Sequence, residues 1–111
     1  MTEPRIQWIV EEAADVFGVS VIDLLSKRRD RPVARARQSA MWVAKHLTRH
    51  SLPEIGRALG DRCHTTVMHG CRKIESLLDE GDHIESKVRL LVALSRTRAI
   101  NEQEAMRGTN S

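Results

Sequence analysis

Apolar residues recur at three- and four-residue spacing along most of the chain, and no stretch shows a β-hairpin signal. This spacing predicts amphipathic helices. The first helix is expected over residues 5–17, and Gly18 is suited to end it. Ser20, with Asp23 three residues later, predicts the start of a short second helix that ends near Leu25.

A basic segment, residues 27–32, follows these two helices. It offers no aliphatic side chain to a core, and Pro32 cannot continue a helix, so we expect the whole segment to be an exposed loop. A long central helix is predicted from about Val33 to Thr48. Four polar residues fall outside its apolar stripe and are expected at the surface: Arg35, Arg37, Gln38 and Lys45.

The next stretch predicts two helices joined by a tight turn. Ser51 and Glu54 form a capping box, and Pro53 falls in the first turn, where a missing N–H is tolerated. Gly60 is expected to end this short helix, and a three-residue turn leads into a second helix that continues to about Leu78. A helix, a tight turn with glycine and a second helix form the outline of a helix-turn-helix motif.

Helical angles divide the second of these helices into two faces. At 100° per residue, Val67, Cys71, Ile74 and Leu78 form one stripe, which we expect to be buried. The opposite face has hydroxyls, an imidazole and two cations but no carboxylate: Thr65, Thr66, His69, Arg72 and Lys73. A surface that meets phosphates and base edges should exclude acids, whereas an ordinary solvated face mixes Glu with Lys.

A last amphipathic helix is predicted over residues 83–106, followed by a disordered tail at 107–111. The expected architecture is therefore all-α, with about six helices in a single domain over residues 1–106. A length of 111 residues suits one domain.

The net charge is only +3, but it is unevenly distributed. Residues 27–73 carry 12 Lys/Arg against 3 Asp/Glu, whereas the segments on either side are acidic. The positive field therefore lies on the basic loop and the predicted helix-turn-helix, which favours nucleic acid as the partner.

Several classes of function are disfavoured. The longest apolar runs have five residues and no secretory signal opens the chain, so we expect a cytoplasmic, nucleoid-associated protein without membrane contact. No phosphate-binding glycine motif occurs, so no nucleotide or other cofactor is expected. Cys63 and Cys71 are expected as reduced thiols rather than metal ligands, and no nucleophile motif indicates an enzyme.

Four segments in unbroken order resemble the C-terminal DNA-binding domain, domain IV, of the bacterial replication initiator DnaA. The resemblance covers about residues 6–95 and is carried by Asp23–Arg29, Val33–Gln38, Leu47–Gly56 and His64–Ile74. It implies a helix-turn-helix fold that binds short asymmetric DnaA boxes in the major groove, with an arginine in the adjacent minor groove.

The resemblance also implies roles for individual residues. Arg29 matches the minor-groove arginine, His64 and Thr65 match base-contacting positions, and Pro53 matches a position near a thymine methyl. Positions on or near the phosphate backbone are matched by Arg37, Gln38, Lys45, Thr66 and His69. We add five basic residues as candidates for phosphate contact or positioning: Lys27, Arg28, Arg31, Arg62 and Lys73.

Two residues of the turn depart from the family pattern. Asp61 stands where the family typically has a second glycine, and Cys63 stands where it has a base-reading aspartate. An aspartate accepts a hydrogen bond from a cytosine amino group, whereas a thiol is a weak partner. We therefore hypothesise that Cys63 relaxes or shifts the box preference at one base pair.

The expected function is regulation of replication initiation, or of box-linked transcription, by a free-standing protein that binds double-stranded DNA at DnaA-box-like sites. The initiator's ATPase domain has no counterpart in these residues, so competition for boxes is the expected mode of action. The alternative is an adaptor that contacts DnaA or a DnaA-inactivating protein and binds DNA without specificity. A fragment of a longer initiator is a third interpretation.

Overall fold

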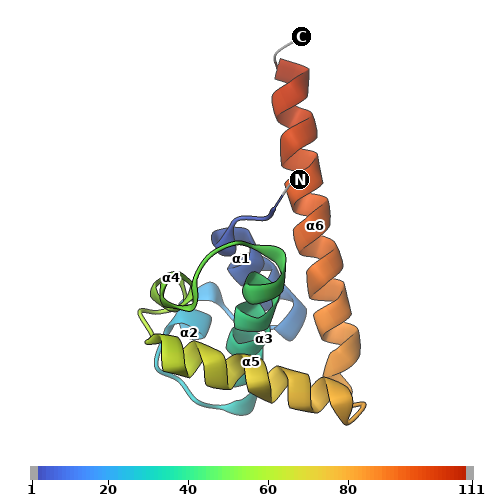
Figure 1. Cartoon of the computed structure of the whole chain (residues 1–111). Helices are drawn as coiled ribbons and strands as arrows, with labels where there is room; N and C mark the ends of the chain where they lie inside the picture. Colours follow the sequence, from blue (N-terminus) through green and yellow to red (C-terminus); the bar gives the residue numbers. More distant parts are fainter. Residues whose placement is uncertain (1–2, 110–111) are drawn as a thin grey trace.

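The computed structural model describes residues 3–109, and these residues form six helices and no strand (Figure 1). The all-α prediction is therefore confirmed. In chain order the helices are α1 (Ile6–Phe17), α2 (Val21–Leu25), α3 (Arg31–Leu47), α4 (Leu52–Ala58), α5 (His64–Asp79) and α6 (Ile84–Thr109).

Helix α3 lies at the centre of the fold and contacts each of the other five helices. Its inner positions include the alanines Ala36, Ala40 and Ala44, which are completely buried. Because alanine projects only a methyl group, α1 and α5 approach α3 closely on either side. The remaining core is aliphatic, with Ile9, Ile55 and other side chains packed around these alanines.

The predicted helix ends are confirmed where a local capping signal marks them. The Ser20 hydroxyl accepts the Asp23 N–H at 3.0 Å and so starts α2. Gly18 ends α1 in the left-handed conformation, with φ +69°, which glycine adopts without steric cost.

The prediction that Arg31 and Pro32 belong to the basic loop is wrong, because both lie in the first turn of α3. A helix does not use the N–H groups of its first turn, so a proline there removes no hydrogen bond. The exposed loop is therefore shorter than expected and comprises residues 27–30.

The predicted buried stripe of α5 is confirmed for Val67, Cys71 and Ile74 but not for its last position. Leu77 is buried instead of Leu78, because Leu77 packs with Ile84 and Val88 of α6 in a second small core cluster. Leu78 lies beside this cluster and is half-buried.

Helix α6 continues to Thr109, beyond the predicted end at residue 106. Residues 107–109 are thus helical rather than part of a tail, and residues 110–111 of the expected tail lie outside the described residues. Figure 1 shows that the C-terminal half of α6 projects past the body formed by the other helices.

Candidate nucleic-acid interface

Helices α4 and α5 form the predicted helix-turn-helix. The Ser51 hydroxyl accepts the Glu54 N–H at 3.3 Å, and the Glu54 carboxylate accepts the Ser51 N–H at 2.8 Å, so the capping box is complete. The bond from the Ser51 backbone N–H is the main cause that lowers the pKa of the Glu54 carboxyl. A carboxylate stabilised in this way holds the start of α4, and with it the exposed Pro53, in a fixed position.

The turn between α4 and α5 uses two residues with left-handed backbone, Gly60 at φ +90° and Asp61 at φ +61°. Asp61 keeps the conformation expected of glycine, and aspartate tolerates it better than most residues do. The turn then folds back on α4, where the Arg62 N–H donates to the Gly56 carbonyl at 2.8 Å. A Cβ atom on Gly56 would collide with the Arg62 carbonyl, so this close return requires glycine.

The outer face of α5 carries the residues that the helical angles predicted. Thr65, Thr66 and His69 are exposed in the first two turns, and Arg72 and Lys73 follow them on the same side. His64, the first residue of α5, is exposed as well. No acid occurs between Asp61 and Glu75. The face therefore presents hydrogen-bonding groups and positive charge without a carboxylate that would repel phosphate.

Cys63 is the N-cap residue of α5, and its thiol is exposed. Its Sγ atom lies 3.3 Å from the Thr66 hydroxyl, and this contact is the main cause that lowers the pKa of the Cys63 thiol. Cys71 is buried on the opposite face of the helix, where desolvation raises its thiol pKa. Both thiols are free, and only Cys63 is accessible to a ligand of this face.

The basic loop lies beside the helix-turn-helix turn. Its residues Lys27, Arg28 and Arg29 are exposed. Arg28 forms ion pairs with Asp23 and Asp30, both at 2.9 Å, whereas Lys27 and Arg29 pair with no carboxylate among the described residues. Lys27 and Arg29 are thus the loop cations that remain available to an anionic partner.

Two arginines fix the start of this loop. Arg37, on α3, donates from Nε to the Leu24 carbonyl at 2.8 Å and from Nη2 to the Ser26 carbonyl at 2.8 Å. A longer bond from Nη2 reaches the Asp23 backbone carbonyl at 3.4 Å. Arg62, from the turn, donates to the same Ser26 carbonyl at 2.5 Å and also to the Leu59 carbonyl. The loop is therefore attached to both α3 and the helix-turn-helix.

The prediction that Arg37 is available at the surface is wrong. Its side chain is only 7% exposed, and its guanidinium group is committed to three backbone carbonyls. Burial is the main cause that lowers the pKa of Arg37, and the positive charge of Arg62 adds to it. This environment makes Arg37 a residue that positions the loop.

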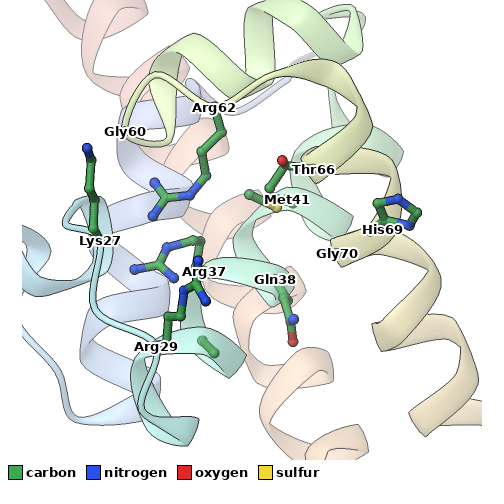
Figure 2. A pocket seen from close by; sticks show the side chains of 11 residues that line it. Lys27, Arg29, Arg37, Gln38, Met41, Gly60, Arg62, Thr66, His69 and Gly70 are labelled. Atoms are coloured by element: carbon green, nitrogen blue, oxygen red, sulfur yellow. The ribbon is translucent and has the colours of Figure 1, made fainter.

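A groove of about 410 Å³ separates the basic loop from α5, and we call it the loop groove. Figure 2 shows the guanidinium groups of Arg37 and Arg62 next to each other, with Lys27 and Arg29 on the loop side. Seven of the predicted site residues line it: Lys27, Arg29, Arg37, Gln38, Arg62, Thr66 and His69. Cations of the loop and polar groups of α5 therefore face one shared hollow.

The other predicted site residues lie outside this groove. Pro53, Cys63, His64 and Thr65 are exposed at the starts of α4 and α5. Lys45 is exposed two turns beyond Gln38 on α3. Arg31 and Lys73 line a neighbouring groove.

Two structural elements of the interface were missed by the sequence analysis. One is the Ser26 carbonyl, a backbone atom for which the sequence contains no signal. The other is the packing of Gly60, where a Cβ atom would collide with Arg62 and with the Leu25 carbonyl. The sequence indicated Gly60 as a helix end, but not as the contact between the turn and the end of α2.

The described residues contain no helix that is long and apolar enough to span a membrane. Between residues 3 and 109, no three His, Cys, Asp or Glu side chains come together in a way that would hold a metal ion.

The fold and the site define a helix-turn-helix domain: a short capped helix, a tight turn and a helix with no acid from His64 to Ile74, next to a loop whose Lys27 and Arg29 form no ion pair among the described residues. Residues 6–74 match the family model described as the bacterial dnaA protein helix-turn-helix, so the chain belongs to this family. The resemblance found in the sequence is thereby confirmed.

Part of a solved structure titled as that of a DNA replication initiation factor has the same fold. It superimposes with a TM-score of 0.73 at 31% sequence identity and covers 85% of this chain. The match takes up 29% of the other chain, so this chain spans less than a third of that protein.

Proposed function

We propose that this chain binds double-stranded DNA at DnaA-box-like sites and thereby regulates replication initiation or transcription linked to such boxes. One observation carries the proposal. Hydrogen bonds from Arg37 and Arg62 to the Ser26 carbonyl hold the loop cations Lys27 and Arg29 beside the acid-free face of α5. Membership of the DnaA helix-turn-helix family supports the same partner.

In the proposed complex, the first turns of α5 enter the major groove and Arg29 reaches the adjacent minor groove. His64 and Thr65 are at the N-terminal end of α5, the part of a recognition helix that contacts base edges. Pro53, exposed at the start of α4, supplies apolar surface for a thymine methyl.

Other residues position the protein on the phosphate backbone. Lys27, Gln38, Thr66 and His69 border the loop groove, and Lys45, Arg31 and Lys73 extend the cationic surface along α3 and α5. Such contacts fix register and orientation without reading sequence. Arg37 and Arg62 contribute to DNA binding indirectly, by positioning the loop, because their guanidinium groups donate to backbone carbonyls.

The proposed regulatory role follows from occupancy of the boxes by this protein. Any protein that binds a box excludes competitors for that box in proportion to its concentration and affinity.

Cys63, at the N-cap of α5, has an exposed thiol in place of a strong acceptor, so we propose weaker discrimination at the base pair it faces.

The test is a titration of a duplex carrying a DnaA box against a scrambled duplex, by fluorescence anisotropy over a series of salt concentrations. The proposal predicts steep salt dependence and at least a ~10³-fold preference for the box. Weak, sequence-independent binding would contradict it and would favour an adaptor that works through protein contacts.

A further inference from the structure

A second groove, of about 520 Å³, lies between the start of α3, the C-terminal half of α5 and the turn into α6. It shares no lining residue with the loop groove. Two of its lining residues, Arg31 and Lys73, belong to the proposed phosphate-contacting surface, whereas Phe17, Arg35, Leu77, Ile84 and Lys87 have no part in the proposed DNA contacts. The chemistry around these other residues requires a separate explanation.

Most of the polar side chains around the second groove are basic. Arg31, Arg35, Lys73, His83 and Lys87 contribute to its lining. Across residues 3–109, none of these five forms an ion pair with a carboxylate, in contrast to Arg28 and Arg98, which do. The rim thus holds positive charge that the described part of the protein leaves unneutralised.

One acid, Asp82, lies among the lining residues, and it has a structural role. Its Oδ1 atom accepts the Ile84 N–H at 2.9 Å, which satisfies a free donor at the start of α6. The carboxylate is thereby directed at the helix end.

The floor of the second groove is apolar. Phe17 is half-buried there beside the buried Leu77 and Ile84, and Pro32 adds to the same surface. The Lys87 ammonium lies 5.1 Å from the centre of the Phe17 ring, so positive charge and apolar surface are adjacent. A duplex backbone offers phosphates but few groups to fill such a floor, whereas a protein segment offers carboxylates and apolar side chains together.

We propose that the second groove docks an acidic amphipathic segment of a partner protein. An apolar side chain of that segment packs against Phe17 and Ile84, and its neighbouring carboxylates pair with Arg35 and Lys87. The docking requires no DNA, because none of these four residues is among the proposed DNA contacts.

The test uses the ¹⁵N-labelled protein without DNA and follows its amide signals by NMR. The probe is a synthetic peptide that alternates glutamate with leucine, and the control peptide has serine in place of leucine at equal charge. We expect saturable shifts concentrated at Phe17, Leu77, Ile84 and Lys87, and binding of the control weaker by about tenfold or more.

Two charge-reversal variants separate the groove from general electrostatics. Lys87→Glu should weaken peptide binding by about tenfold, while Arg96→Glu, an equal change at an exposed residue of the same helix, should leave it within about twofold. Circular dichroism and thermal unfolding check that both variants are folded.

Several outcomes would overturn the proposal. These are no peptide binding at about 1 mM, equal binding of the serine control, or equal loss in both variants. Shifts at Phe17 and Ile84 caused by a box duplex would assign the groove to DNA, and shifts caused by raising the protein concentration would assign it to a second copy. Because the peptide titration contains no DNA, its failure leaves the proposed box binding untouched.

Discussion

Arg37 and Arg62 donate hydrogen bonds to one acceptor, the carbonyl oxygen of Ser26, at 2.8 and 2.5 Å. Arg37 comes from the central helix and Arg62 from the turn of the helix-turn-helix, while Ser26 immediately precedes the basic loop. The loop is therefore ordered relative to α5 before any DNA arrives. Such preorganisation reduces the entropy lost when both elements engage one duplex.

The first prediction concerns the stability of this arrangement. Arg37→Ala should lower the free energy of unfolding by about 3 kcal/mol, because the Leu24 carbonyl loses the Arg37 donor, the Ser26 carbonyl keeps only Arg62, and the packing of a buried side chain is lost. Arg37→Lys should also destabilise, since an ammonium cannot replace the guanidinium fork. Urea denaturation measures both.

Arg35→Ala is the matched control for Arg37, because its side chain is more exposed and bonds only to Gln38 among the hydrogen bonds described. It should change stability by about 0.5 kcal/mol or less. An Arg37→Ala protein with the unfolding midpoint of the wild type would show that the carbonyl contacts do not hold the loop.

The second prediction compares two glycines with positive φ. A Cβ atom at Gly18 would contact no other atom, so Gly18→Ala should lower the free energy of unfolding only by the backbone strain, about 1 kcal/mol. Gly60→Ala should cost at least about 1 kcal/mol more, because its Cβ collides with Arg62 and the Leu25 carbonyl, and it should weaken box binding. Equal unfolding midpoints for the two variants would argue against tight packing of the turn on the end of α2.

The third prediction uses the two thiols as probes. Cys63 should react with iodoacetamide faster than Cys71, because its pKa is lowered by the Thr66 hydroxyl while burial raises the pKa of Cys71. A saturating box duplex should slow the reaction at Cys63, whereas a scrambled duplex at equal concentration should not. Mass spectrometry after timed quenching gives both rates, and unchanged labelling of Cys63 under the box duplex would place it outside the interface.

The fourth prediction concerns the base preference that the Cys63 thiol confers. Cys63→Asp places a strong acceptor at the N-cap of α5, a position that favours aspartate in any case. It should therefore add about 1–3 kcal/mol of discrimination at one base pair of the box. Cys63→Ser is the control of similar size, and an identical base preference in all three proteins would exclude this position from base reading.

The sequence predicted those features that depend on local spacing. The capping box at Ser51 and Glu54 and the acid-free face of α5 follow from residues a few positions apart, and the structure contains both. The domain class could be predicted for the same reason.

Features that depend on tertiary placement could not be predicted in this way. Arg37 lies two turns before Ala44 at the edge of the apolar stripe of α3, and its charge led to the expectation of a surface position. The approach of the α2 end buries it and offers it carbonyl acceptors, which the sequence does not show. The choice of Leu77 over Leu78 likewise depends on where α6 crosses α5. The loop groove is lined by residues far apart in sequence, from the loop, α3, the turn and α5, which the tertiary fold brings together.

The central claim is that the basic loop and α5 read one duplex together, and a base-substitution series tests it most directly. Affinities of wild type, Arg29→Ala and Thr65→Val are measured for boxes changed at each position in turn. Arg29→Ala should lose about 1–3 kcal/mol of discrimination at one end of the box, and Thr65→Val a similar amount at a separate cluster of positions. The same positional profile for all three proteins would contradict the account.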